Sequence, residues 1–263
     1  MTVESVSDRA GPAQPTAVLS TEGLRWRVGG FEIIRGIDLD IHDGEFLSVI
    51  GPNGAGKSSL INLLSGVHSA SDGRIFTSGE DITTLRPADR TRRGIGRTFQ
   101  TSSLFPGLTV LENARLASQA ALGGSLDLVR RPKRNDLATT TAMDRITEVG
   151  LADRADQPVT DLPHGDKRKL EIAIVLCTEP KVLLLDEPTA GVSAEEVGPL
   201  VDVVRDVHGR GRTVVMVEHR MEIVLDVSDR IAVVHRGELL ACDVPDVVVA
   251  DERVRDAYLG AEL

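Results

Sequence analysis

The stretch that most constrains the fold is the octapeptide GPNGAGKS, which spans Gly51 to Ser58. It follows the apolar run FLSVI and precedes the helix-forming run SLINLLSG, so a strand and a helix are expected on its two sides. The octapeptide fits G-x-x-x-x-G-K-[ST], a pattern in which backbone N–H groups and a helix N-terminus cradle phosphate groups. A glycine-rich turn that matched by chance would lack these flanking elements, so the sequence predicts a phosphate-binding loop, called the P-loop below.

The members of the P-loop have different expected roles. Lys57 is expected to extend from a solvent-facing loop to the β- and γ-phosphates of a nucleotide, with little structural role of its own. The hydroxyl of Ser58 is expected to bind Mg²⁺. The remaining binding residues are expected to contribute mainly backbone groups: Gly51, Pro52, Asn53, Gly54, Ala55, Gly56 and Ser59.

A second motif, VLLLDEP, lies far downstream at residues 182–188. Its apolar run predicts a buried strand that ends in two carboxylates. Asp186 at the strand tip is expected to hold Mg²⁺ through water, and Glu187 is expected to polarise an attacking water molecule. An acidic turn after a strand is common by itself, but together with the P-loop it indicates nucleotide hydrolysis.

The composition excludes several functions. The chain has 263 residues, with 30 basic and 40 acidic side chains, a net charge of −10 and 3% aromatic residues. This balance argues against a nucleic-acid partner, which usually requires a basic excess or stacking rings. No apolar run approaches the roughly 20 residues that a membrane-spanning helix needs. Cys177 and Cys242 lack metal-ligand spacing and fit a reducing cytoplasm, and residues 1–17 are expected to form a disordered tail.

The rest of the chain alternates strand-like and helix-like segments, which predicts an α/β core with a mainly parallel sheet. Two or three antiparallel strands within residues 18–50 are expected to form an N-terminal β-subdomain. A helical subdomain of about residues 101–178 is expected as an insert in a single domain of residues 18–263. We expect helices at 57–66, 110–121, 136–149 and 194–208 and one that starts near Pro87, and strands at 182–186, 213–217, 230–235 and 238–243.

Just before the acidic strand the chain reads LPHGDKRKLEIA, a tight turn that runs into a helix. A P-loop, a helical insert, this turn and LLLDEP, in that order, resemble the ATP-binding-cassette (ABC) ATPases over nearly the whole chain from about residue 18. In that family a signature turn opens a helix whose N-terminus caps the γ-phosphate of ATP held by a second subunit. The resemblance implies that Gly165 allows close backbone approach to that phosphate. It places the signature at Leu162, Pro163, His164, Gly165 and Asp166.

Other landmarks of the family fall in order. Gln100 in RTFQ matches the glutamine that senses Mg²⁺ or the attacking water and couples to the membrane partner. Residues 190–193, AGVS, stand where the D-loop lies, although its usual aspartate is absent. His219 in VEHRM matches the switch histidine that contacts the γ-phosphate. The resemblance therefore implies ATP and Mg²⁺ as ligands, with Glu187, His219 and Gln100 as catalytic residues.

Within the family, this chain resembles the importer ATPases for branched-chain amino acids in two segments, RTFQTSSLFPGLTVLENA and the ending VRDAYLGAEL. Related ATPases for urea, short amides or aromatic acids have similar sequences. The resemblance implies a head-to-tail dimer with an identical or a different ATPase, a separate membrane permease and an extracytoplasmic solute-binding protein. It also implies a peripheral position at the cytoplasmic face of the cell membrane, with a chain that is soluble when isolated. Two rivals fit less well: a regulatory ABC ATPase often carries two cassettes or a coiled coil, and a P-loop kinase has no use for a signature helix.

The sequence departs from the family pattern at two sites. Pro163 replaces the signature serine, and Asp166 replaces its glutamine and brings a negative charge near an anion. His164 either donates a hydrogen bond in place of that serine or is a solvated loop residue. At the adenine platform Val28 stands where the family usually has an aromatic residue. Trp26, on the same strand face, either stacks on adenine or packs in the core.

Overall fold

The computed structural model describes residues 17–98, 104–123 and 136–259, and its centre is a six-stranded sheet. The strand order is β10-β9-β3-β8-β7-β6, in which β10 pairs antiparallel with β9 and the other pairs are parallel. The predicted mainly parallel α/β core is therefore confirmed. Its strands are β3 (Phe46–Ile50), β6 (Ile95–Arg97), β7 (Val182–Asp186), β8 (Thr213–Val217), β9 (Arg230–His235) and β10 (Glu238–Asp243).

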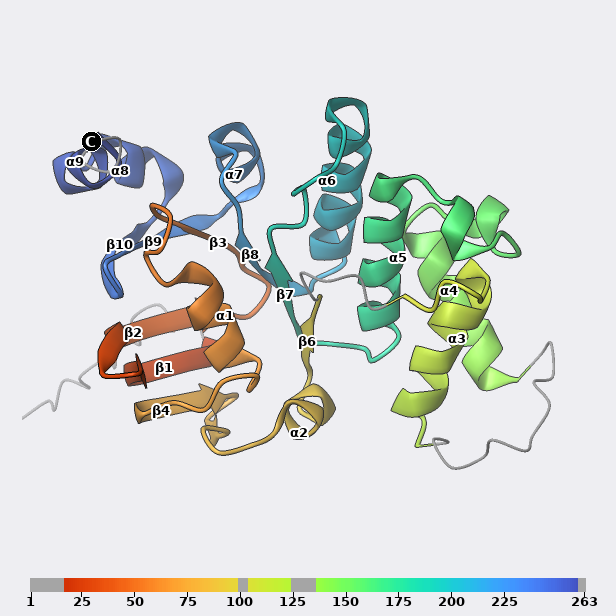
Figure 1. The fold of residues 1–263 in the computed structure, drawn as a ribbon, viewed down its shortest axis with the longest axis horizontal. Coiled ribbons are helices and arrows are strands. Elements are labelled where there is room, and N and C mark those ends of the chain that lie inside the picture. The colour runs from red at the N-terminus through yellow and green to blue at the C-terminus, as the bar shows by residue number, and fades with distance from the viewer. Residues whose placement is uncertain (1–16, 99–103, 124–135, 260–263) are drawn as a thin grey trace, which may run out of the picture.

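A second, antiparallel sheet comes from the N-terminal part of the chain, as predicted. Its order is β2-β1-β4-β5, built from β1 (Ala17–Val28), β2 (Phe31–His42), β4 (Asp72–Thr77) and β5 (Glu80–Asp81). Gly29 and Gly30 close the β1–β2 hairpin with φ angles of 55° and 87°, which suit a two-residue hairpin turn. Helix α1 (Lys57–Leu64) lies between the two sheets (Figure 1).

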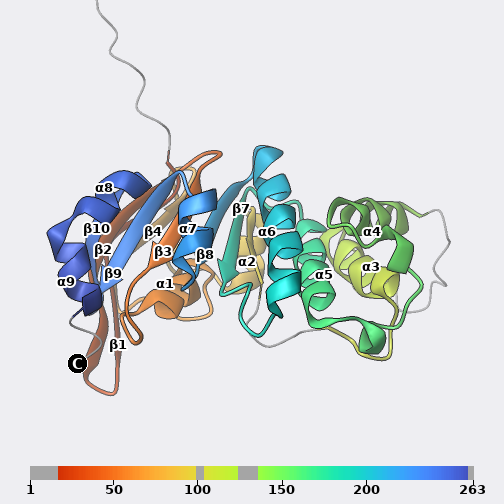
Figure 2. The same cartoon turned by 90° about the horizontal axis from the view of Figure 1, so that it is seen from above.

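The other helices are distributed over several parts of the molecule (Figure 1). Three of them, α3 (Val110–Ala121), α4 (Leu137–Glu148) and α5 (His164–Leu176), gather at one end of the molecule, as Figures 1 and 2 show. They form the predicted helical insert, and two agree with the expected ranges to within a residue. The remaining helices are α2 (Pro87–Arg92), α6 (Ala194–Gly209), α7 (Met221–Val227), α8 (Pro245–Ala250) and α9 (Glu252–Leu259). The expected N-terminal tail and the segment 124–135 lie outside the described residues, except for Ala17 in β1.

The central strands are apolar throughout because both of their faces are buried. In β7, Leu184 packs in a cluster with α1 and the antiparallel sheet, while Leu183 and Leu185 pack in a second cluster with α3–α6. The alternation in β8 is the same, with Val215 on the first side and Met216 on the second. Side chains of a strand alternate between its two faces, so a continuous apolar run fills both cores.

A fully buried arginine fixes the end of the P-loop helix. Arg90 of α2 is 1% exposed, and its guanidinium donates to the carbonyls of Leu63 at 2.5 Å and Leu64 at 2.9 Å, at the C-terminal end of α1. It also donates to the carbonyls of Leu85 at 3.1 Å and Thr83 at 2.8 Å. Burial lowers the pKa of Arg90 to about 10, so the side chain stays charged at neutral pH and satisfies carbonyl groups that a helix end leaves unpaired.

We expect Arg90→Met to lower the free energy of unfolding by about 3 kcal/mol, because it leaves several buried carbonyls without a donor. Urea denaturation measures this loss. The matched control is Arg92→Met on the same helix, where the side chain is 68% exposed and its ion pair with Asp89 contributes little. Equal stability of the Arg90 and Arg92 variants would contradict a structural role for the buried guanidinium.

Candidate nucleotide-binding site

The P-loop joins β3 to α1 in a conformation that requires glycine at two places. Gly51 has a φ of 149°, and a Cβ there would lie 2.0 Å from the carbonyl oxygen of Val234 in β9. Gly56 has a φ of 109°, and its Cβ would lie 2.9 Å from Cδ1 of Ile34 in β2. The loop therefore packs closely between β9 and β2, which sets the place of the α1 N-terminus that follows.

Lys57 is not on a solvent-facing loop, contrary to our expectation from the sequence. It is 6% exposed, and its Nζ donates to the carbonyls of Gly51 at 2.7 Å and Pro52 at 3.0 Å. Burial lowers the pKa of the ammonium group, while Glu187 and Asp186 oppose that shift. The side chain thus closes the loop on itself, and its charge lies beside both carboxylates of the second motif.

Asp186 meets the P-loop at the carboxyl end of β7. Its Oδ1 accepts from the Ser58 hydroxyl at 3.2 Å, and its Oδ2 accepts from Arg97 at the end of β6 at 3.3 Å. Burial raises the pKa of Asp186, while the charge of Arg97 and the hydrogen bond from Ser58 lower it. Arg97 also donates to Ser65 at 2.8 Å. Sequence reasoning did not identify this arginine, because its partner Asp186 is distant along the chain.

Glu187 and His219 lie at the same edge of the sheet. Oε1 of Glu187 and Nε2 of His219 are 2.6 Å apart, and both side chains reach solvent. Glu187 has a φ of 51°, in the left-handed region that a residue other than glycine seldom adopts. Such strain is often found at functional sites, so the two residues predicted as catalytic stand in a suitable arrangement.

Glu218, which the sequence analysis did not single out, connects the loops that carry these two residues. It is 3% exposed, and its Oε1 accepts from the backbone N–H of Thr189 at 3.1 Å and from the Thr189 hydroxyl at 2.5 Å. Its Oε2 accepts from the backbone N–H groups of His219 at 2.9 Å and Arg220 at 3.4 Å. One buried carboxylate therefore fixes the segment after Glu187 relative to His219.

The signature residues lie at the start of α5, far from this chain's own P-loop in sequence. Leu162 is buried, and Pro163 is the N-cap residue, with an exposed His164 after it. Nε2 of His164 lies 3.4 Å from the place where a Cβ on Gly191 would stand, so the ring faces the expected D-loop. Asp166 forms ion pairs of 3.3 Å with each of two cations of its own subunit, Arg154 and Lys169. Its negative charge is thus balanced internally, which the sequence did not predict.

The β1–β2 hairpin carries the residues considered for adenine. One face of the Trp26 ring stacks on His68, with centroids 4.3 Å apart, and Trp26 also packs against the core. Val28 is 49% exposed and pairs across the hairpin with Phe31, which is 75% exposed. Opposite residues of an antiparallel pair share a face, so Phe31 offers an aromatic ring beside Val28. The hairpin register, unknown from the sequence, reveals this candidate.

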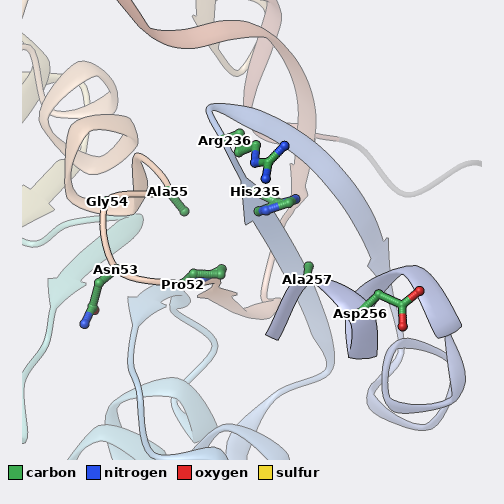
Figure 3. Close-up of a pocket in the computed structure, with 8 residues that line it drawn as sticks. All are labelled: Pro52, Asn53, Gly54, Ala55, His235, Arg236, Asp256 and Ala257. Atoms are coloured by element: carbon green, nitrogen blue, oxygen red, sulfur yellow. The ribbon is translucent and has the colours of Figure 1, made fainter. Parts of the chain in front are cut away.

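A cavity of about 340 Å³ adjoins the P-loop (Figure 3). The loop forms one wall, and the turn between β9 and β10 and the helix α9 form the others. The lining residues are Pro52, Asn53, Gly54, Ala55, His235, Arg236, Asp256 and Ala257. The C-terminal segment is therefore in contact with the space beside the phosphate loop. Gln100 lies outside the described residues.

This arrangement of a P-loop, a buried aspartate and a glutamate–histidine pair is typical of P-loop nucleotide hydrolases. The chain belongs to the ABC transporter family of ATP-binding proteins: residues 34–190 match the family model described as ABC transporter. Residues 238–263 match a second model, described as branched-chain amino acid ATP-binding cassette transporter.

Individual relatives agree with this assignment. The chain is 35% identical over 250 residues to the high-affinity branched-chain amino acid transport ATP-binding protein LivG of Escherichia coli K12, covering 92% of this chain and 98% of LivG. It is 32% identical over 246 residues to the lipopolysaccharide export system ATP-binding protein LptB of Haemophilus influenzae, covering 94% and 98%. The crystal structure of MJ1267, an ATP-binding cassette of an ABC transporter in its ADP conformation, superposes with a TM-score of 0.82 at 30% identity and covers 93% of this chain and 99% of that one.

Over the described parts of the chain, none of the helices combines the length and the apolar character that crossing a membrane requires.

We expect Glu218→Gln to lower the rate of ATP turnover by up to about 10²-fold, because its NH₂ group would face backbone donors and shift the His219 loop. The KM for ATP should stay nearly unchanged, since the P-loop is separate. Steady-state ATPase kinetics measure both values, with Glu222→Gln on the exposed side of α7 as the control. Turnover equal to that of the control would show that Glu218 does not position the catalytic loops.

Proposed function

We propose that this chain is the ATP-hydrolysing subunit of an importer that takes up branched-chain amino acids through a separate permease. The hydrolytic part rests on one observation, the 2.6 Å contact of Glu187 with His219 beside the buried Asp186 and the P-loop. The substrate rests on the C-terminal match at residues 238–263 and on the similarity to LivG. A second candidate, export of a lipid-linked solute, is favoured by the similarity to LptB.

The P-loop backbone and Lys57 would hold the β- and γ-phosphates, because the charge of Lys57 already lies where the loop carbonyls converge. Ser58 and Asp186 fit Mg²⁺, since their side-chain oxygens are 3.2 Å apart and Mg²⁺ prefers such hard donors. The bound metal would neutralise charge on the phosphate oxygens. Gln100 is a further proposed ligand of the metal or the attacking water.

Glu187 would accept a proton from the attacking water, and His219 would contact the γ-phosphate. Their mutual contact of 2.6 Å keeps both groups at one position before nucleotide binds. Glu187 also has the strained φ of 51° that is often found at functional sites. A general base placed in this way contributes to catalysis only when water lies within hydrogen-bond reach.

The signature residues Leu162–Asp166 would act on the nucleotide of a second ATPase subunit, identical or different. Membrane attachment would come from the permease rather than from this chain, and a solute-binding protein would deliver the substrate outside the membrane. Co-purification from membranes tests this assembly: recovery of two permease subunits and an amino-acid-binding protein supports it. Recovery of lipid-export subunits would support the second candidate instead.

If Glu187 activates water, Glu187→Gln should retain ATP binding and lose roughly 10²–10⁴ in turnover. The variant should also accumulate an ATP-bound dimer, because hydrolysis no longer reopens it. ATPase assays with the partner subunits present, together with sizing in ATP, measure the two effects. Turnover near that of the unmodified chain would remove Glu187 from the mechanism.

Gly165→Asp should leave ATP binding to the separate subunit almost unchanged and block ATP-driven dimer closure. Its side chain would meet Glu196, whose Cβ lies 2.9 Å from the place of a Cβ on Gly165, and would add charge where a phosphate should approach. Nucleotide titration and chemical cross-linking separate the two effects, with Lys57→Ala as the variant that loses binding in its own site. A loss of monomer affinity as large as that of Lys57→Ala would contradict a trans-acting signature.

A further inference from the structure

The signature helix receives a carboxylate from its own subunit. The backbone N–H of Gly165, in the first turn of α5, donates to Oε1 of Glu196 at 3.1 Å. Glu196 belongs to the first turn of α6, which lies beside α5 (Figure 1), and its Oε2 accepts from the Ser193 hydroxyl at 2.7 Å. A Cβ on Gly165 would stand 2.9 Å from both Cβ and Oε1 of Glu196, so a larger residue would displace this carboxylate.

The contact caps a backbone N–H group at the N-terminus of α5. The first N–H groups of a helix have no partner within the helix, and a side-chain oxygen at the N-cap usually accepts from one of them. The N-cap here is Pro163, which has no such oxygen. The carboxylate of Glu196 supplies the missing acceptor, and a negative charge at this end of a helix is favourable.

The carboxylate stays ionised in this position. The hydrogen bond from the Ser193 hydroxyl lowers the pKa of Glu196, burial opposes that shift, and the backbone N–H groups of Gly165 and Ser193 lower the pKa further. An anion therefore lies on the same N–H group that, in the proposed function, meets the γ-phosphate of the second subunit's ATP.

We propose that Glu196 competes with the second subunit's γ-phosphate for the Gly165 N–H group and so sets the ATP concentration at which the dimer closes. The proposal rests on the trans role of the signature stated above. One N–H group cannot serve two anions at short range, and a carboxylate repels a phosphate. The Glu196 side chain must therefore turn away before the phosphate docks, and Ser193 is placed to retain it.

If Glu196 were only a structural cap, its removal would change the ATP concentration needed for closure in the opposite direction. If Glu196 only supported the start of α5, its removal would loosen the signature and raise the ATP concentration needed for closure. If Glu196 competes, its removal lowers that concentration. A charge at a helix terminus shifts an equilibrium by about 2- to 5-fold, and hence the closure equilibrium by about 4- to 25-fold in a dimer with two equivalent signatures. Because two ATP molecules are bound on closure, the ATP concentration at the midpoint moves by the square root of that factor, about 2- to 5-fold.

The test uses the full chain with its partner subunits, in the Glu187→Gln background so that closure is not reversed by hydrolysis. ATP is titrated, and closure is followed by cross-linking. We expect Glu196→Ala to lower the ATP concentration at the midpoint by about 2- to 5-fold, or by about 1.4- to 2.2-fold if only one site carries this signature. Glu196→Gln keeps a hydrogen-bond acceptor without the charge, so its closure midpoint should lie between those of the unmodified chain and Glu196→Ala. Glu195→Ala, an exposed residue of the same charge on the same turn, is the control.

Hydrogen exchange of the Gly165 amide provides an independent readout in the nucleotide-free chain, where Glu196→Ala should speed it and Glu195→Ala should not. An unchanged or raised closure midpoint in Glu196→Ala, with melting behaviour like that of the control, would overturn the competition. Unchanged exchange at Gly165 would also overturn it. If ATP fails to close the dimer even with Glu196 intact, the trans role of the signature fails first, and the competition fails with it.

Discussion

The pairing of β7 with β8 is the constraint that places the proposed catalytic residues at one edge of the sheet. Asp186 lies opposite Val217 in the parallel register, and the backbone N–H of Glu187 donates to the Val217 carbonyl at 3.0 Å. Glu187 and Glu218 therefore leave the sheet side by side, although they are distant in sequence. Because side chains alternate along a strand, a slip of one residue would turn Asp186 away from Ser58 and take the buried leucines of β7 to the wrong core.

The order of elements was predictable because its signals are local. The apolar runs of β3, β7 and β8, the P-loop pattern and the 3.6-residue period of the helices each depend on a few neighbouring residues. Of the residues expected at the phosphate and metal positions, Lys57, Ser58 and Asp186 lie close together, because the carboxyl ends of parallel strands share one edge of the sheet.

Contacts between distant segments could not be predicted in the same way. The burial of Lys57 depends on how the loop folds back, and the partners of Glu218 come from a separate loop. The aromatic ring of Phe31 lies beside Val28 only through the hairpin register. The charge of Asp166 looked unfavourable in the sequence, but Arg154 and Lys169 balance it in the fold. Each of these features requires knowing which segments meet.

These internal partners explain how a chain with a net charge of −10 can form a site for a polyanion. Attraction comes from Lys57 and from the backbone N–H groups at the start of α1. Two carboxylates are held by donors of the same subunit: Arg97 holds Asp186 beside the P-loop, and the Gly165 N–H group holds Glu196 beside the signature.

At these two carboxylates, nucleotide binding and dimer closure would therefore exchange one set of charge-assisted contacts for another of similar kind. The free energy of closure is the difference between these two sets, so it is small compared with either set. A modest change in one internal contact can then shift the balance between open and closed dimers. In a transporter ATPase this equilibrium must respond to the permease. A site whose internal carboxylates keep the free energy of closure small can be shifted by such a partner.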